Sequence, residues 1–203
     1  AIYSTFLQRA YDQIIHDIAL QKLPVRIMLD RAGLVGDDGP THHGVFDLSF
    51  LRPIPNIIIS APKDEAEFKA LIKLSTDCND QPFIIRYPRG SAPQPKFLEP
   101  QNLTVGKNEL LKKGKDATIV AIGTMVYPAM EAVERLEQEG ISVTVINCRF
   151  LKPFDEELFL NNIENNKVIT IEENSVKGGL GSAMLELLEE KGLNNVKVKT
   201  MGI

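Results

Sequence analysis

Residues 25–44 read VRIMLDRAGLVGDDGPTHHG, a buried-strand pattern that runs directly into a polar, glycine-rich loop. The run from Val25 to Leu29 is apolar at four of five positions, as in a strand of a parallel sheet. The residues after it have no apolar periodicity and combine charged side chains, two adjacent histidines and four glycines. Because ligands bind beyond the carboxyl ends of strands in open α/β sheets, this pattern predicts a functional loop on a parallel sheet.

The composition of the loop is suited to holding reactive groups in fixed positions. Its glycines allow positive φ angles and close approach to a ligand, whereas Pro40 stiffens the part that carries Asp38 and His42. A carboxylate and an imidazole in fixed positions can exchange protons with a bound molecule. We therefore interpret Asp38 and His42 as candidate acid/base residues.

Along the whole chain, short β-branched runs alternate with longer helical stripes, which is the pattern of parallel-sheet α/β domains. We expect strands at residues 25–29, 56–60, 83–87, 117–123, 141–147, 167–171 and 196–200. We expect helices at residues 5–20, 62–75, 126–139, 155–162 and 179–191. The second half of the chain is thus predicted to form a compact unit of four strands and three helices.

The domain organisation follows from a proline-rich segment in the middle of the chain. Four prolines stand at positions 88, 93, 95 and 100, where little apolar periodicity is present, so this segment is predicted to be an extended linker. We divide the chain into residues 1–90, a linker at 91–104, and residues 105–203. The predicted fold class is two α/β domains with mainly parallel sheets.

Composition excludes several classes of protein. The chain has 203 residues, of which 43% are hydrophobic and 25% charged, as in an ordinary globular protein. Its net charge of -4 argues against nucleic acid as the main partner. No apolar run reaches the roughly 20 residues that cross a bilayer, so we expect no membrane association. Cys78 and Cys148 fit no metal-ligand spacing and are predicted to be reduced thiols.

Three segments carry a family resemblance, namely YSTFLQRAYDQ at 3–13, the loop at 30–44, and RYPRG at 86–90. Together they closely resemble the 1-deoxy-D-xylulose-5-phosphate synthases, thiamine-diphosphate enzymes related to transketolase. The resemblance covers the whole chain and implies part of a pyrimidine-binding domain followed by a transketolase-like C-terminal domain. Transketolases share an Asp-Gly-Pro-Thr-His core like residues 38–42, whereas the flanking residues favour the synthases.

The resemblance implies an activity and its cofactors. The synthases use thiamine diphosphate to decarboxylate pyruvate and transfer the two-carbon unit to glyceraldehyde 3-phosphate, a step toward isoprenoids, thiamine and pyridoxal. The resemblance also implies Mg²⁺, a homodimer, and a cytoplasmic location, or a plastid location in a plant or alga.

The ends of the chain lead us to expect a fragment. The chain begins at Ala1 without an initiator methionine and stops at Ile203 directly after an expected strand. In the family, the residues that bind Mg²⁺ and the diphosphate, and the glutamate that activates the cofactor, belong to segments before this one. We therefore expect a C-terminal two-thirds fragment that has no metal ligand of its own, binds the cofactor weakly and is inactive alone.

By resemblance, five residues are assigned to the cofactor and to the substrate phosphate. Phe6 would stack on the aminopyrimidine ring, and Arg9 would lie beside the intermediate bound to the thiazolium. Tyr3, Arg31 and Arg89 would hold the phosphate of the acceptor, a role that suits planar guanidinium groups.

The catalytic assignments by resemblance are His42, Asp38 and Arg9. Asp38 and His42 would contact the hydroxyl and carbonyl of the acceptor, where a proton must reach the new alkoxide. Histidine gains and loses a proton near neutral pH and therefore suits this step. His43 departs from the small or amide residue expected after the Thr-His pair, so its contribution stays open.

Several of these residues also have a structural interpretation. Phe6 lies on an apolar helical stripe and could pack in the core, and Arg9 could be a solvated helix charge. Arg31 could pair with Asp30 or Asp37, Arg89 could be a charge at the end of the linker, and Asp38 could bond its own turn.

A second glycine-rich segment and two other functions complete the set of hypotheses. The GGLG sequence at 178–181 opens a predicted helix but lacks a Walker lysine and an acidic partner, so close helix packing is favoured over phosphate binding. One alternative function is a transketolase or a 2-oxo acid dehydrogenase β-subunit-like fragment. The other is a non-catalytic dimerisation or regulatory module.

Overall fold

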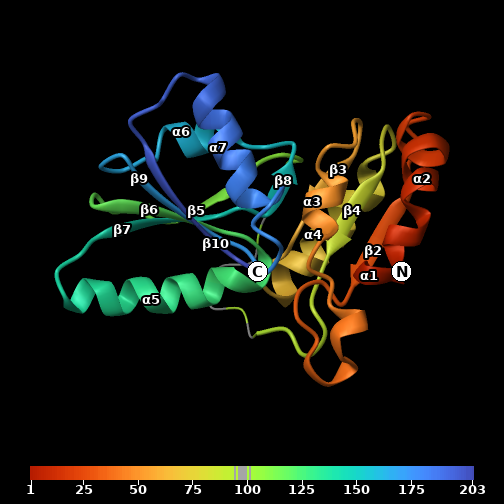
Figure 1. Cartoon of the computed structure of the whole chain (residues 1–203), viewed down its shortest axis with the longest axis horizontal. Coiled ribbons are helices and arrows are strands. Elements are labelled where there is room, and N and C mark those ends of the chain that lie inside the picture. The colour runs from red at the N-terminus through yellow and green to blue at the C-terminus, as the bar shows by residue number, and fades with distance from the viewer. Residues whose placement is uncertain (94, 96–99, 101) are drawn as a thin grey trace.

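The computed structural model describes residues 1–93, 95, 100 and 102–203. Among these residues, two five-stranded sheets form the framework (Figure 1). The first sheet has the order β1-β2-β4-β3-β8. Its strands are β1 (Ile2–Tyr3), β2 (Arg26–Asp30), β4 (Phe83–Arg86), β3 (Ile58–Ser60) and β8 (Phe150–Lys152). The pairs among β1, β2, β4 and β3 are parallel, and β8 joins β3 antiparallel.

The second sheet has the order β10-β9-β6-β7-β5 and comes entirely from the second half of the chain. Its strands are β10 (Lys197–Met201), β9 (Lys167–Ile171), β6 (Ala117–Ala121), β7 (Val143–Asn147) and β5 (Glu109–Lys112). β5 is antiparallel to β7, and the other pairs are parallel. The predicted fold class, two α/β domains with mainly parallel sheets, is confirmed.

Four of the predicted helices lie close to their predicted positions. They are α4 (Glu65–Asp77), α5 (Val126–Gln138), α6 (Glu156–Leu160) and α7 (Leu180–Glu190). α5 runs along one side of the second sheet and α7 along the other (Figure 1). α4 begins where the Asp64 side chain accepts a hydrogen bond from the Glu67 N–H, and α5 ends before Gly140, whose φ is 80°. In the described part of the chain, no helix has the length and apolar character needed to span a bilayer.

The first predicted helix, at 5–20, is not one continuous α-helix. It consists of α1 (Ser4–Leu7), a 3₁₀ turn, α2 (Tyr11–Gln13) and a π-helical segment at Ile14–Ala19. Ala10 leaves the helical region with φ −106° and ψ 20°, which interrupts the hydrogen-bond ladder. Leu7 and Ile14 are buried, whereas Phe6 is 36% exposed, so the core interpretation of Phe6 is wrong.

The count of four strands for the second half is also wrong. The pattern missed β5 and β8, and in the first half it missed β1 and α3 (Asp47–Leu51). These elements have two to five residues each, too few to show a period. Of the predicted linker, residues 94, 96–99 and 101 lie outside the described residues, and the division at 1–90, 91–104 and 105–203 stays a prediction.

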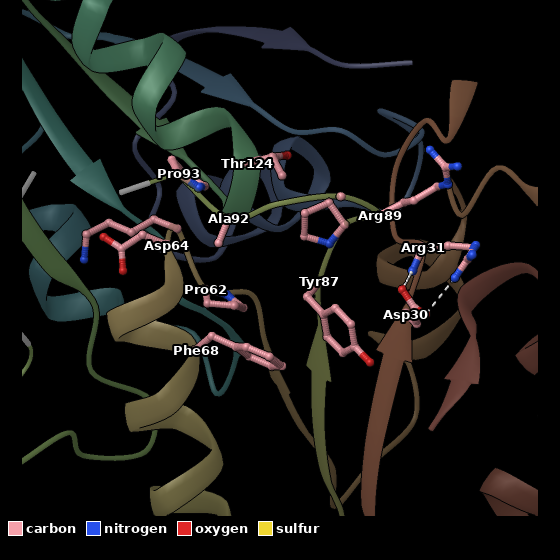
Figure 2. Close-up of a pocket in the computed structure, with 13 residues that line it drawn as sticks. Asp30, Arg31, Pro62, Asp64, Phe68, Tyr87, Arg89, Ala92, Pro93 and Thr124 are labelled. Carbon is pink, nitrogen blue, oxygen red and sulfur yellow. Dashed lines mark hydrogen bonds and ion pairs between the residues drawn. The ribbon is translucent and has the colours of Figure 1, made fainter. Parts of the chain in front are cut away.

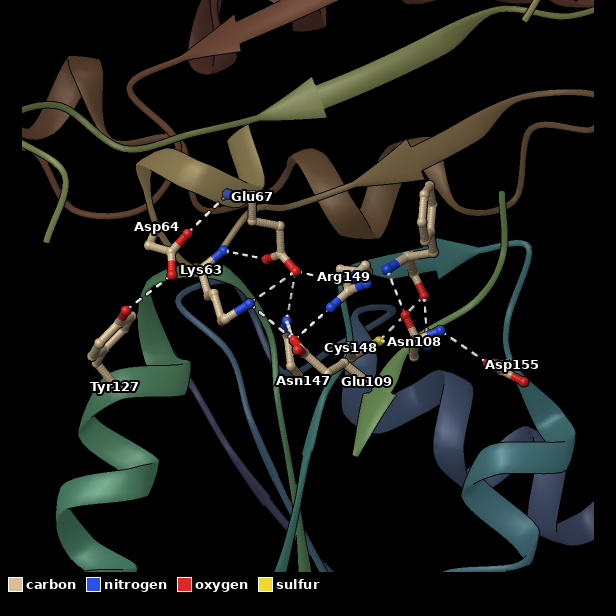
Figure 3. A network of polar contacts seen from close by, with 11 residues as sticks. Lys63, Asp64, Glu67, Asn108, Glu109, Tyr127, Asn147, Cys148, Arg149 and Asp155 are labelled. Atoms are coloured by element: carbon tan, nitrogen blue, oxygen red, sulfur yellow. Dashed lines mark hydrogen bonds and ion pairs between the residues drawn. The ribbon is translucent and has the colours of Figure 1, made fainter. Parts of the chain in front are cut away.

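The two halves are joined through the β3–β8 pairing and a polar network (Figure 3). Glu67 of α4 and Glu109 of β5 both receive ion pairs from Lys63 and Arg149. Lys63 Nζ lies 3.3 Å from Glu67 Oε1 and 2.9 Å from Glu109 Oε2. Burial alone raises the pKa of Glu109, but Arg149 and Lys63 outweigh it and the pKa is lowered. The charges are mutually paired, so this network fixes how the halves pack.

Candidate functional site

The loop at 30–44 leaves the carboxyl end of β2 and closes on itself at a neck. Gly33 and Gly44 exchange two backbone hydrogen bonds of 2.8 and 2.9 Å, and the Ala32 N–H donates to the Tyr87 carbonyl at the end of β4. Arg31 has a φ of 58°, a left-handed conformation uncommon outside glycine. The loop is thus fixed at its base, and Arg31 is held in a strained backbone conformation.

Arg31, Asp38 and Arg89 meet at one carboxylate oxygen. Asp38 Oδ2 lies 2.8 Å from Arg31 Nε and 3.0 Å from Arg89 Nε, while Arg31 Nη1 pairs with Asp30 at 2.8 Å. The hydrogen bond from Arg31 lowers the pKa of Asp38, and the same bond raises the pKa of Arg31. The Asp38 side chain is 21% exposed and that of Arg89 45%, so solvent reaches this meeting point.

Aromatic side chains connect this charged group to the start of the chain. The Arg31 guanidinium lies 3.9 Å from the centre of the Tyr3 ring, which stacks on Phe6 at 5.5 Å. The His42 ring meets Phe6 edge-on at 5.3 Å, and the Arg9 guanidinium lies 5.7 Å from the Phe6 ring. All seven residues singled out from the sequence therefore form one connected cluster. The role of each residue stays a prediction.

The two adjacent histidines have different surroundings. His42 faces Phe6 and Tyr3, and its Nδ1 lies 3.0 Å from the Thr41 hydroxyl. His43 Nδ1 accepts a 3.2 Å hydrogen bond from the Val35 N–H, inside the loop. His42 thus belongs to the cluster, and His43 fixes the shape of the loop.

A buried ion pair beneath the cluster gave no signal in the sequence. Arg86 at the end of β4 pairs with Asp47 of α3 through Nε at 3.0 and 3.1 Å, and Ser4 donates a 3.0 Å hydrogen bond to Asp47. Asp47 is fully buried and Arg86 nearly so. The pair ties the first helix to the strand end that leads to Arg89. Asp47 stands in no motif, and Arg86 opens the RYPRG segment without a predicted role of its own, so the sequence did not identify the pair.

A cavity of about 400 Å³ opens beside the cluster (Figure 2). Arg31 and Arg89 form one side of it, Phe68 and Tyr87 supply an apolar wall, and Thr124 comes from the second half of the chain. Arg31 and Arg89 thus line one edge of the cavity, while their guanidinium groups point away from its apolar wall (Figure 2) and meet at Asp38.

The GGLG segment at 178–181 is already occupied by a carboxylate of the protein itself. The N–H groups of Leu180 and Gly181 each donate a 2.9 Å hydrogen bond to Glu172, which is 2% exposed. A Cβ at Gly179 would lie 1.9 Å from Glu172 Oε2. This geometry agrees with the predicted close packing of the helix start and leaves no room for a phosphate at these N–H groups.

Two domain models match the chain, the transketolase pyrimidine-binding domain at residues 1–95 and the transketolase C-terminal domain at 106–203. Similar curated proteins include 1-deoxy-D-xylulose-5-phosphate synthases of Halothermothrix orenii, 57% identical, Syntrophus aciditrophicus, 51%, and Geobacter sulfurreducens, 52%. Each alignment covers all of this chain and 31–32% of the relative. The chain thus spans about a third of the length of these relatives, so the expectation of a two-thirds fragment is wrong.

Solved structures agree with this assignment. A split-gene transketolase, described as an inactive beta4 tetramer, is 36% identical with a TM-score of 0.89, over 99% of this chain and 64% of that one. A transketolase mutant from Pichia stipitis is 23% identical with a TM-score of 0.74, over 96% of this chain and 33% of that one, and shows the fold alone. The chain belongs to the transketolase-type family of the 1-deoxy-D-xylulose-5-phosphate synthases.

Proposed function

We propose that this chain supplies the acceptor site and the pyrimidine contacts of a 1-deoxy-D-xylulose-5-phosphate synthase. The whole protein would decarboxylate pyruvate and transfer the two-carbon unit to glyceraldehyde 3-phosphate. The observation that carries the proposal is the convergence of Arg31 and Arg89 on one carboxylate oxygen of the partly exposed Asp38, at 2.8 and 3.0 Å. Such a pair of guanidinium groups suits an oxygen of a phosphate monoester.

The phosphate of the acceptor would take the place that Asp38 Oδ2 now occupies between the two guanidinium groups. Tyr3 lies flat beneath Arg31 and would keep its guanidinium plane directed at the phosphate. Asp38, displaced from the arginines, would then accept a hydrogen bond from a hydroxyl of the sugar. The Asp38 carboxylate would thus pair with the two arginines in the free site and bind a hydroxyl of the acceptor in the loaded site.

His42 would handle the proton of the acceptor carbonyl. Carbon–carbon bond formation turns that carbonyl into an alkoxide, which needs a proton donor within hydrogen-bond reach. His42 stands in the same loop as Asp38, and its ring meets those of Tyr3 and Phe6, so an aldehyde held by its phosphate would extend toward the imidazole.

The residues present fit one end of thiamine diphosphate. Phe6 is partly exposed and would contact the aminopyrimidine through its ring, and Arg9 stands beside it. When bound, the cofactor supplies the electron sink for decarboxylation. Within the described ranges no group of three or more His, Cys, Asp or Glu side chains could hold a metal ion. In the proposed enzyme, Mg²⁺ and the diphosphate would be held by other parts of the full-length protein. We propose that this protein is a homodimer in the cytoplasm.

The test uses the full-length protein with pyruvate and either glyceraldehyde 3-phosphate or unphosphorylated glyceraldehyde. Arg31→Ala and Arg89→Ala should each lower kcat/KM for the phosphorylated acceptor by roughly 10- to 100-fold, because a hydrogen bond to a charged group contributes about 1.5–3 kcal/mol. Both should change kcat/KM for glyceraldehyde much less. Arg135→Ala, in the last turn of α5, is the matched control.

Two outcomes would count against the proposal. Turnover of ketose phosphates, with none of pyruvate plus glyceraldehyde 3-phosphate, would indicate a transketolase. Equal losses with both acceptors would mean that the two arginines do not bind the phosphate. The isolated chain should bind thiamine diphosphate weakly and should not turn over, and micromolar affinity in calorimetry would contradict that expectation.

A further inference from the structure

The second half of the chain reaches the loop at 30–44 through Glu173, which follows β9. Glu173 Oε1 accepts a 3.0 Å hydrogen bond from the Leu34 N–H, and Oε2 accepts a 2.7 Å hydrogen bond from the Thr124 hydroxyl. The carboxylate also packs against Gly33, where a Cβ would lie 2.4 Å from Glu173 Cδ. A glycine is therefore required at position 33 for this contact as well as for its φ of 82°.

The contact falls on the neck of the loop. Gly33 and Leu34 stand between Arg31 and Asp38 in the chain, and Gly33 is hydrogen-bonded to Gly44, two residues after His42. A shift of this neck would move the groups on both sides of the loop together. Glu173 thus acts on the geometry of the cluster without touching it.

Glu173 is itself fixed by groups that do not belong to the loop. Its carbonyl accepts a 3.3 Å hydrogen bond from Arg86, which is paired with the buried Asp47. Thr124 lies in the turn that precedes α5 and lines the cavity shared with Arg31 and Arg89 (Figure 2). Glu173 is therefore anchored outside the loop at two points, by Arg86 at its backbone carbonyl and by Thr124 at its carboxylate.

We propose that Glu173 is a positioning residue for the acceptor site, an inference that rests on the proposed function. It sets the distance between Arg31 and Asp38 by holding the Leu34 amide, and so makes the C-terminal half part of the site. A glutamine should largely replace it, because the amide oxygen can accept from the Leu34 N–H while the amide nitrogen donates to the Thr124 hydroxyl. An alanine should not.

A matched control separates an effect of Glu173 on the loop from its contribution to the contact between the two halves. Glu186 of α7 forms two hydrogen bonds, of 2.5 and 2.6 Å, with Arg52 of the first half. That pair links the same two halves but does not touch the loop. Loss of either carboxylate weakens the joint, and only the loss of Glu173 should alter the acceptor site.

The experiment compares Glu173→Ala, Glu173→Gln and Glu186→Ala in the full-length protein. For Glu173→Ala we expect KM for glyceraldehyde 3-phosphate to rise by about 10-fold or more, since small displacements of a positioned group are costly. Pyruvate decarboxylation measured without acceptor should stay within about twofold. Glu173→Gln should recover most of the loss, and Glu186→Ala should leave KM unchanged.

A second readout does not depend on activity. Hydrogen exchange of the amides at 33–38 should accelerate by about 10-fold or more in Glu173→Ala and not in Glu186→Ala, because the Leu34 amide loses its acceptor. Equal KM changes in the two alanine variants, or unchanged exchange at 33–38, would overturn the positioning role. Wild-type protein inactive with pyruvate and glyceraldehyde 3-phosphate would instead overturn the proposed function, while the exchange data would still decide the role of Glu173.

Discussion

The loop at 30–44 and the turn at 178–181 are both glycine-rich and both follow a strand of a parallel sheet, but the first is open and the second is filled. In the loop, Asp38 is 21% exposed and receives two guanidinium groups. In the turn, Glu172 is 2% exposed and receives two backbone N–H groups. Each segment is already bound to a carboxylate of the protein itself, so glycine content alone does not identify a phosphate site.

The two segments differ in whether that anion can leave. If Asp38 turns away, Arg31 and Arg89 remain solvated and can accept a phosphate. If Glu172 turned away, two N–H groups would stay buried without an acceptor, at a cost of about 1–3 kcal/mol for each. Changes in the loop should therefore reduce activity, and changes in the turn should reduce stability.

The largest effect is expected in the open loop, for His42→Ala. In the full-length enzyme, turnover should fall roughly 100-fold or more, the usual size of an acid/base contribution. Urea unfolding should be nearly unchanged, since His42 makes few structural contacts. His16→Ala, an exposed histidine paired with Asp12, is the control and should leave turnover unaltered.

His43→Ala sharpens the same comparison within one loop. It should lower turnover less than His42→Ala but cost about 1 kcal/mol of stability, because the Val35 N–H loses its acceptor. Equal losses of turnover in the two variants would contradict the assignment of the proton donor to His42.

In the filled turn, Glu172→Ala should lower the free energy of unfolding by about 2–6 kcal/mol, since both N–H groups lose their acceptor. Glu172→Gln should cost less because the amide oxygen can still accept one of them. Urea unfolding of Glu172→Ala, Glu172→Gln and Asp38→Asn measures how much each substitution lowers the free energy of unfolding. A Glu172→Ala variant as stable as Asp38→Asn would refute the distinction between filled and open segments.

The sequence was sufficient for the parts of the fold that have a clear period. The continuous apolar run of β4 and the stripe of α5 were predicted within two residues of their bounds, because β-branched runs and helical spacing are local signals. β8 could not be found in this way. It has three residues, and the strand with which it pairs, β3, stands about ninety residues earlier in the sequence.

The candidate site shows the same limit. The resemblance named all seven members of the cluster because each stands in one of the three motifs at 3–13, 30–44 and 86–90. It did not name Arg86 and Asp47, whose buried ion pair holds the first helix, or Glu173, which holds the loop from the second half of the chain. Arg86 opens the RYPRG motif without a predicted role there, and Asp47 and Glu173 stand in no motif, so what the three side chains contact is decided by tertiary packing.

A smaller effect separates two glycines, one from each segment. A Cβ at Gly181 would lie 2.5 Å from Thr200 Cγ2 and 3.0 Å from Thr170 Oγ1, so Gly181→Ala should cost about 1–3 kcal/mol through overpacking. At Gly36, with a φ of 60°, a Cβ would meet no atom within 4 Å, so Gly36→Ala should cost about 1 kcal/mol through backbone strain alone. Urea unfolding of both variants checks the order, and a more destabilising Gly36→Ala would reverse it.

The smallest effect is the pH dependence of stability, and it should have opposite signs in the two segments. The hydrogen bond from Arg31 lowers the pKa of Asp38 below its ordinary 3.8, so its contribution is present above pH 3.8 and is lost as the pH falls through the folded value. Burial raises the pKa of Glu172 above 4.5, more than its N–H hydrogen bonds lower it. The contribution of Glu172 is therefore present below pH 4.5 and is lost as the pH rises through the folded value.

Urea midpoints between pH 3 and 7 test both signs against neutral variants. The stability advantage of the wild type over Asp38→Asn should be constant above pH 3.8 and shrink below it. Relative to Glu172→Gln, the wild type should lose stability as the pH rises above 4.5. Parallel curves for Glu172→Gln and the wild type across this range would mean that the buried carboxylate has an ordinary pKa, and that its N–H hydrogen bonds balance its burial.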